Sequence, residues 1–241
     1  GESGVAAGDV SLIIHGTTLA TNALIERKGV TTALVTTEGF RDSVEMGTES
    51  RFEQYDINME KPLPLVPRRR RFTVPERLNA AGEVILALDE AAVAALVAPL
   101  KRLRVESIAI GFLHSYVNPA HERRAHEILA AALPDVTFTL SSDVSPEMRE
   151  YERFSTACAN AYVQPIMAQY LRRLEAGLKA QGFGCPLYVM LSGGGVADIE
   201  TGIRFPIRLV ESGPVGGAIF SSHTAAECGL SQVLSFDMGG T

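Results

Sequence analysis

The chain has 241 residues, of which 46% are hydrophobic and 21% are charged, so it can bury one large core or two small ones. Its formal net charge of −6 argues against a protein that binds nucleic acid or anionic membranes over its whole surface. The longest apolar run, residues 91–100, is too short to span a bilayer, and three widely spaced cysteines predict neither a disulfide scaffold nor a zinc site.

The first third of the chain predicts alternating elements followed by an excursion. The predicted elements are a strand at residues 10–14, a helix from Thr17 or Thr18 to about residue 28, a strand at 31–36 and a short helix at 39–46. Residues 51–88 differ, because four prolines exclude a regular helix over much of this segment. We expect a long surface loop there, followed by a hairpin with strands at 72–78 and 83–87.

The rest of the chain returns to a regular alternation. Helices are predicted over residues 89–102, 118–133, 145–181 and 213–229, with Pro165 breaking or kinking the third of them. Strands are predicted over residues 108–113, 136–140, 187–191, 207–210 and 232–236. Helices that alternate with apolar strands are typical of an α/β fold with a buried, partly parallel sheet.

The last segment carries the strongest local signal for chemistry. A predicted strand runs into the pattern Asp-x-Gly-Gly-Thr, formed by Asp237, Gly239, Gly240 and Thr241. Glycines after a strand let backbone N–H groups approach a phosphate, and an aspartate can hold Mg²⁺. The same pattern equally fits a plain β-turn that contains an aspartate.

Two helix starts also place small or polar residues together. Gly213 and Gly216 lie at the start of the last predicted helix, where either tight helix packing or a crossing between two lobes explains them. His15, Thr17 and Thr18 lie at a strand-to-helix junction, where backbone N–H groups suit an anion. A helix cap beside a structural histidine is the alternative interpretation of that junction.

Other charged segments predict surface. His121 and Glu122 share a helix with two arginines, which predicts a solvated face. Arg149 and Arg153 share one face of a charge-dense helix start, which predicts either surface ion pairs with neighbouring glutamates or the lining of a cleft for an anionic substrate. The arginine run at 68–71 predicts a solvated loop or an interface with an acidic partner subunit. His114 ends a predicted strand and competes with His15 for any catalytic role.

Several stretches, in the same order along the chain, resemble the hydantoinase A/5-oxoprolinase family of ATP-dependent enzymes. They are residues 15–29, 33–42, 113–122, 146–153, 160–163, 211–214 and 237–241. This family includes 5-oxoprolinases, hydantoin hydrolases, and subunits of acetone and acetophenone carboxylases. Many relatives have Ser-Asn-Gly-Gly where this chain has Gly193 after Ser192, so any role of that asparagine does not carry over.

The resemblance implies an α/β fold of the actin/Hsp70/sugar-kinase type, in which two lobes with ribonuclease-H-like mixed sheets enclose ATP and Mg²⁺. Residues 1–230 would form part of the N-terminal lobe, with 51–88 as the excursion and 214–229 as the helix between lobes. Residues 231–241 would supply the first strand and a truncated phosphate loop of the second lobe. The other phosphate loop would precede residue 1, so the resemblance implies a fragment that is inactive by itself.

The resemblance also implies a reaction, in which ATP activates a cyclic amide or imide through a phosphorylated intermediate and water opens the ring. The implied ATP contacts are Asp237, Gly239, Gly240, Thr241, Gly213 and Gly216, with Asp237 also holding Mg²⁺. The implied catalytic residues on the substrate side are His15, Thr17 and Thr18. One alternative is a subunit of an ATP-dependent acetone/acetophenone-type carboxylase, and another is a non-catalytic actin-like scaffold that binds nucleotide.

The implied partners are a small cyclic amide or imide, a second subunit or domain of the hydantoinase B type, and further copies of the chain in an oligomer. Neither nucleic acid nor a membrane is expected as a partner. The use of cysteine and the absence of a visible signal sequence favour the cytoplasm.

Overall fold

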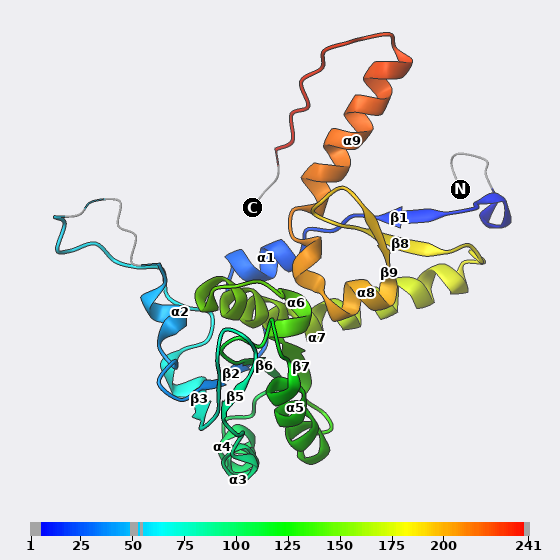
Figure 1. Cartoon of the computed structure of the whole chain (residues 1–241). Coiled ribbons are helices and arrows are strands. Elements are labelled where there is room, and N and C mark those ends of the chain that lie inside the picture. The colour runs from blue at the N-terminus through cyan, green and yellow to red at the C-terminus, as the bar shows by residue number, and fades with distance from the viewer. Residues whose placement is uncertain (1–5, 49–52, 54, 239–241) are drawn as a thin grey trace. The chain divides into compact units, whose positions relative to one another are not determined.

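A computed structural model describes residues 6–48, 53 and 55–238. Its residues divide into two compact units, which are taken separately below. Unit 1 comprises residues 1–29 and 166–241, and unit 2 comprises residues 30–165. Both are built from strands with helices beside them, so the α/β class predicted from the alternating pattern is confirmed (Figure 1).

Unit 2 contains a four-stranded parallel sheet in the order β3-β2-β6-β7. Its strands are β2 (Thr32–Thr37), β3 (Arg71–Val74), β6 (Ser107–Gly111) and β7 (Thr137–Leu140). Strands β2 and β6 are buried along their whole length, as is typical of the inner strands of a parallel sheet that is covered on both faces. Their buried side chains are mostly apolar, and the polar ones are Thr32, Thr36, Thr37 and Ser107. Leu100, Ile108, Ile110 and Leu129 belong to the core of this unit.

The helices of unit 2 follow the strands. They are α2 (Ser43–Met46), η2 (Arg68–Arg70), α3 (Glu90–Ala95), α4 (Val97–Arg102), α5 (Ala120–Ala132) and α6 (Ser141–Val144). The start of α7 (Glu150–Ala180) packs here, and the ring of Phe154 leaves no room for a side chain at Gly111: a β-carbon there would lie 2.5 Å from the ring. Helix α7 contributes residues to both units, and the division falls directly after Pro165.

Unit 1 contains a mixed three-stranded sheet in the order β1-β8-β9. β1 (Ile13–His15) pairs in parallel with β8 (Leu187–Met190), and β8 pairs antiparallel with β9 (Val196–Asp198). The helices of this unit are η1 (Ala7–Asp9), α1 (Leu19–Ile25), α8 (Ile199–Arg204), η3 (Pro206–Leu209) and α9 (Ser212–Glu227). Helix α9 is the last regular element of the described chain (Figure 1).

Prolines explain two differences from the predicted elements. The strand predicted at 72–78 is two strands, because Pro75 has no N–H: β3 joins the parallel sheet, and only β4 (Arg77–Leu78) forms the hairpin with β5 (Val84–Leu86). The helix predicted at 89–102 is divided into α3 and α4, with Pro99 close to the division.

Other boundaries also differ. The helix predicted from residue 145 begins only at Glu150, after Arg149 in the left-handed region, and it then runs through Pro165 as one element. The strand predicted at 207–210 is the short helix η3, with Pro206 at its first position. Residues 232–236 form no strand, since a strand needs a pairing partner and the described chain supplies none for them. The short elements β9, α6 and α8 were not predicted.

Candidate functional site

The turn after β1 and the first turn of α9 lie side by side in unit 1. The Ser212 hydroxyl accepts a hydrogen bond from the Thr17 amide at 3.4 Å and donates one to the Thr17 carbonyl oxygen at 3.2 Å. The Glu211 amide donates to the Thr21 hydroxyl at 3.2 Å. Ser212 is only 1% exposed, so these bonds are sheltered from water and hold the two segments together.

A cavity of about 540 Å³ opens next to this contact. Its lining comes from β1, β8 and α9: Ile14, Gly16, Met190, Ser212, Gly213, Gly216, Ile219, Phe220 and His223. One end is polar, formed by the Gly16 backbone and the first turn of α9, and the walls are apolar. An apolar pocket with a few convergent polar groups is the usual form of a small-molecule site.

Some glycines of α9 line the cavity, and another faces solvent. Gly213 and Gly216 line the cavity, and a β-carbon at Gly216 would lie 3.9 Å from the Met190 methyl carbon. Gly217 is exposed, does not line the cavity, and has nothing within 4 Å of an added β-carbon. A glycine inside a helix costs about 1 kcal/mol relative to alanine, so Gly216 keeps space in the cavity at the expense of helix stability.

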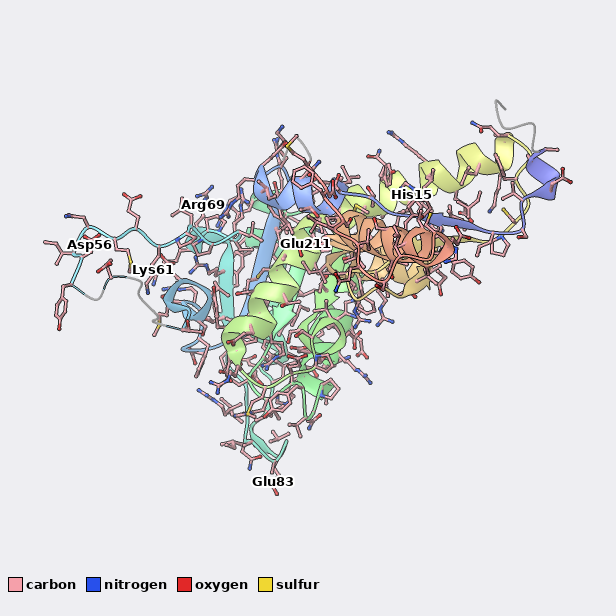
Figure 2. The ribbon with its side chains drawn as sticks, turned by 90° about the horizontal axis from the view of Figure 1, so that it is seen from above. His15, Asp56, Lys61, Arg69, Glu83 and Glu211 are labelled. Atoms are coloured by element: carbon pink, nitrogen blue, oxygen red, sulfur yellow. The ribbon has the colours of Figure 1, made fainter. Side chains whose placement is uncertain are left out.

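His15 does not line this cavity. Successive side chains of a strand point to opposite faces, and here Ile14 and Gly16 line the cavity while the His15 ring Nε2 lies 2.8 Å from the Tyr170 hydroxyl of α7. Figure 2 shows His15 on β1 and Glu211 at the start of α9. Burial lowers the pKa of His15 below its ordinary value, which favours the neutral ring.

The side chains of Thr17 and Thr18 lie in the turn between β1 and α1. The Thr17 hydroxyl accepts from the Leu19 amide at 3.2 Å, while Thr18 is the residue before α1 and its side chain makes no capping hydrogen bond. The backbone of Thr17 therefore contacts Ser212, which lines the cavity, whereas the Thr17 hydroxyl is used by a hydrogen bond within its own turn.

The terminal motif is described only in part. Asp237 is exposed and lies in a segment without regular structure, whereas Gly239, Gly240 and Thr241 lie outside the described residues. Within the described residues, no three His, Cys, Asp or Glu side chains are grouped so that they could hold a metal ion. Asp237 is thus a single carboxylate there, not part of a preformed metal cage.

A buried polar network in unit 2 was not predicted. Glu122, expected on the surface, is fully buried and accepts hydrogen bonds from the Phe112 amide, from the Ser141 hydroxyl at 2.6 Å, and from the Ser142 amide and hydroxyl. Arg153, expected in surface ion pairs, is also fully buried. Its Nε donates to the Ser141 hydroxyl at 3.1 Å, and its other nitrogens donate to the carbonyl oxygens of Glu147 and Phe112.

Two further histidines lie in unit 2: His121, which was predicted on the surface, and His114, which was predicted to compete with His15 for a catalytic role. His121 pairs with the buried carboxylate of Glu76 at 2.8 Å, and Glu76 also accepts from the Thr37 hydroxyl. His114 has φ of 56°, a strained value for a residue other than glycine. No cavity described for unit 2 is lined by these residues.

Sequence reasoning found the glycines of the cavity and missed its walls. Gly213 and Gly216 stand beside a helix start, which is a visible signal. Ile14, Met190 and Phe220 are ordinary apolar residues in the sequence, and only their convergence in the structure identifies them as cavity lining.

Among the helices of the described chain, none combines the length and the apolar character needed to cross a membrane.

The chain matches two family models that together cover most of its length. Residues 1–133 match the hydantoinase/oxoprolinase N-terminal region, and residues 153–241 match the hydantoinase/oxoprolinase model. The chain is 37% identical to the caprolactamase subunit alpha of Pseudomonas jessenii, over 97% of this chain and 34% of that protein. It is 32% identical to the acetophenone carboxylase gamma subunit of Aromatoleum aromaticum, over 96% of this chain and 33% of that protein.

Two solved structures have folds similar to that of this chain. The crystal structure of ATP-dependent caprolactamase from Pseudomonas jessenii matches with a TM-score of 0.87 and 36% identity, over 98% of this chain and 34% of that chain. A nucleotide-free acetone carboxylase structure matches with a TM-score of 0.81 and 26% identity, over 90% of this chain and 32% of that chain. The chain therefore spans about a third of the length of these relatives.

Proposed function

Because the chain belongs to the hydantoinase/oxoprolinase family, we propose that it forms part of an ATP-dependent hydrolase that opens a cyclic amide or imide. The observation that carries this proposal is the cavity of unit 1, where Gly16, Ser212, Gly213 and Gly216 converge from segments about 200 residues apart. The polar end of this cavity suits an amide oxygen, and its apolar walls suit a ring. In this proposal the activity belongs to a longer protein, and the 241 residues alone are inactive.

The chemistry proposed is activation followed by hydrolysis. The γ-phosphoryl group of ATP is transferred to the amide oxygen, which makes the amide carbon electrophilic. Water adds to that carbon, the carbon–nitrogen bond breaks as the nitrogen takes up a proton, and the ring opens to an acyl phosphate. A second water molecule hydrolyses the acyl phosphate to the carboxylate and inorganic phosphate. Phosphoryl transfer depends mainly on positioning and charge neutralisation. The Gly16 backbone and the start of α9 would orient the amide, and Ser212 would hold these two segments in place.

The residues proposed for Mg²⁺ and phosphate are those of the terminal motif. Magnesium is commonly held by one or two carboxylates together with phosphate oxygens and water, so a single exposed carboxylate such as Asp237 fits that chemistry. When bound, the ion would neutralise charge on the phosphates. Gly239, Gly240 and Thr241 remain the proposed phosphate contacts. Gly213 and Gly216, which the resemblance assigns to ATP, line the cavity of unit 1, so we propose them for the substrate amide instead. His15, Thr17 and Thr18 remain the residues proposed on the substrate side. Because the His15 ring contacts Tyr170 and not the cavity, its proposed role is to fix the position of β1, whose neighbouring residues line the cavity.

The proposed domain organisation follows the family. Residues 1–230 would be part of the N-terminal lobe, with 51–88 as its excursion and 214–229 as the helix that leads to the next lobe. Residues 231–241 would begin that second lobe. The division into units places β1, α1 and α9 in unit 1 together, which supports treating the cavity as a feature of one body.

Partners and location are also proposed. Both the caprolactamase and the acetophenone carboxylase relatives are named as subunits, which supports a second subunit for this protein. A cytoplasmic location is supported by the cysteines, since Cys158, Cys185 and Cys228 are all free thiols.

A carboxylase subunit is the second candidate function. It is favoured by the similarity to the acetophenone carboxylase gamma subunit and to the acetone carboxylase structure. In this case ATP would activate a ketone or bicarbonate, and carbon–carbon bond formation would replace ring opening.

The test is the substrate that stimulates ATP hydrolysis by the full-length protein with its partner subunit. Stimulation by a lactam or cyclic imide, with stoichiometric ring opening, supports the proposed hydrolase. Stimulation only by a ketone with bicarbonate supports the carboxylase. Slow ATP hydrolysis that no substrate changes would leave a nucleotide-binding scaffold, and no ATP binding at all would overturn all three.

A further inference from the structure

We infer that the cavity of unit 1 takes a cyclic amide whose ring is uncharged and apolar, in preference to a ring that carries a carboxylate. This inference rests on the proposed function and narrows it to a class of substrate. It follows from the walls of the cavity: Ile14, Met190, Ile219 and Phe220 offer hydrocarbon and thioether surface and no hydrogen-bond donor. A ring that contacts them loses its water without gaining polar partners.

The charge of the lining supports the same conclusion. Among the described residues that line the cavity there is no lysine or arginine. The imidazole of His223 is the one basic group of this lining, and its Nε2 lies 3.3 Å from the carboxylate of Glu227, which offsets its charge when it is protonated. The wall side chains Ile14, Ile219 and Phe220 are 48%, 46% and 71% exposed, so it is the bound ring that covers them. A carboxylate on the ring loses part of its hydration against this apolar surface without gaining a cationic partner, and an uncharged ring avoids that cost.

The polar end of the cavity is matched to the amide, not to a second anionic group. The first turn of α9 carries the partial positive charge of a helix N-terminus, which suits the oxygen of an amide. Glu211 stands directly before this turn and adds a negative charge beside it. With the amide at this end, the ring lies along the face of α9 that carries Gly216, Phe220 and His223.

The length of that face sets the size of the ligand. From Gly216 to His223 the helix rises about 10 Å, at about 1.5 Å per residue. This distance accommodates a lactam ring of five to seven members with its amide held at the polar end. Gly216, which has no side chain, leaves the space beside the Met190 methyl carbon for the ring.

The test uses two substrates that differ by one carboxylate, 2-pyrrolidinone and 5-oxoproline. The full-length protein with its partner subunit is assayed for lactam-dependent ATP hydrolysis with each, and with ε-caprolactam as a larger apolar ring. The expected result is a kcat/KM at least about tenfold higher for 2-pyrrolidinone than for 5-oxoproline, mainly through KM. Equal use of the two rings, or preference for 5-oxoproline, overturns the inference and leaves the proposed function standing.

A charge placed on the wall gives a second measurement. Ile219→Arg adds a cation to a partly exposed wall position, and Ser222→Arg adds the same cation to an exposed position of α9 that does not line the cavity. We expect Ile219→Arg to shift the ratio of the two kcat/KM values about tenfold or more toward 5-oxoproline, and Ser222→Arg to leave it unchanged. Equal shifts in both variants contradict the inference. If no lactam stimulates ATP hydrolysis but a ketone with bicarbonate does, it is the proposed function that fails.

Discussion

The hydroxyl oxygen of Ser212 lies 3.2 Å from the carbonyl oxygen of Thr17 and 3.4 Å from its amide nitrogen, although 195 residues separate the two in the chain. Ser212→Ala removes both hydrogen bonds and leaves the partly buried Thr17 peptide groups without this partner. We expect the free energy of unfolding to fall by about 1 kcal/mol, because that is the usual net value of such bonds. Faster hydrogen exchange at the Thr17 amide would show that the loss is local.

The control for this change is Ser222→Ala, on an exposed turn of the same helix. It should leave both the stability and the Thr17 exchange rate unchanged within error. If Ser212→Ala and Ser222→Ala behave alike in hydrogen exchange, Ser212 does not hold the turn after β1.

Gly216 and Gly217 give a matched pair for the cavity. Each alanine substitution should stabilise α9 by up to about 1 kcal/mol, because glycine is the poorer helix former. Only Gly216→Ala places a methyl group in the cavity, where Met190 lies 3.9 Å away. We therefore expect Gly216→Ala to raise the KM for the lactam about tenfold in the full-length protein and Gly217→Ala to leave it unchanged. A normal KM in Gly216→Ala would show that the ring does not bind against this face.

Glu122 holds several loop ends of unit 2 together. Its carboxylate accepts hydrogen bonds from Phe112, Ser141 and Ser142, and Ser141 in turn accepts from the guanidinium of Arg153. Glu122→Gln replaces a charged acceptor with an amide that also presents donors, and it removes one of the two carboxylates, Glu122 and Glu150, whose charges compensate the buried Arg153. We expect a loss of about 3 kcal/mol in the free energy of unfolding, measured in urea.

The matched control is Glu127→Gln on the same helix. Glu127 is exposed and pairs with Arg124 at 2.9 Å on the surface. Surface pairs contribute about 0–1 kcal/mol, so this variant should be nearly as stable as the parent chain. Similar losses in both variants would mean that burial of Glu122 does not decide its contribution.

His15 predicts a pH dependence of stability. Burial lowers the pKa of His15, so the folded chain binds this proton more weakly than the unfolded chain does. Stability from this group is therefore complete above the ordinary histidine pKa of about 6.5 and is lost as the pH falls below it. We expect the decrease in unfolding free energy between pH 7.5 and pH 5.5 to be smaller in His15→Gln than in the parent chain.

Tyr170→Phe separates burial from hydrogen bonding at the same position. It removes the hydroxyl that lies 2.8 Å from His15 Nε2 and keeps the aromatic ring. Because burial is the cause of the lowered pKa, this variant should retain the pH dependence of the parent chain. A pH dependence lost equally in both variants would assign the effect to the hydrogen bond.

The cysteines are expected to differ in reactivity. Burial raises the pKa of the Cys158 thiol to about 12, so at pH 8 it stays protonated and shielded, whereas Cys228 is exposed. A thiol reagent at pH 8 should label Cys228 within minutes and Cys158 only at the rate of unfolding. The variant Cys228→Ser is the control. Rapid labelling of Cys158 in that folded variant would contradict its burial.

Much of the fold was predictable because its signals are local. The strands β2 and β6 are buried on both faces, and β7 is partly buried; all three were predicted as strands from their local sequence. The excursion with its hairpin was also visible from its prolines, although the partner of β3 was not. No local signal identifies a strand that pairs with β2 across more than thirty residues, because that pairing is a long-range contact.

The candidate site also combines features that the sequence predicts with features that only the tertiary structure shows. The sequence alone determined that the chain is α/β, that it resembles ATP-dependent cyclic amidohydrolases, and that glycines begin the last helix, because composition, spacing and motif order are properties of neighbours in the chain. Only the tertiary structure decided that Ser212 clamps Thr17, that His15 faces Tyr170 and not the cavity, and that Glu122 and Arg153 are buried. Burial and the direction of a side chain depend on what packs against it, and those partners come from distant parts of the chain.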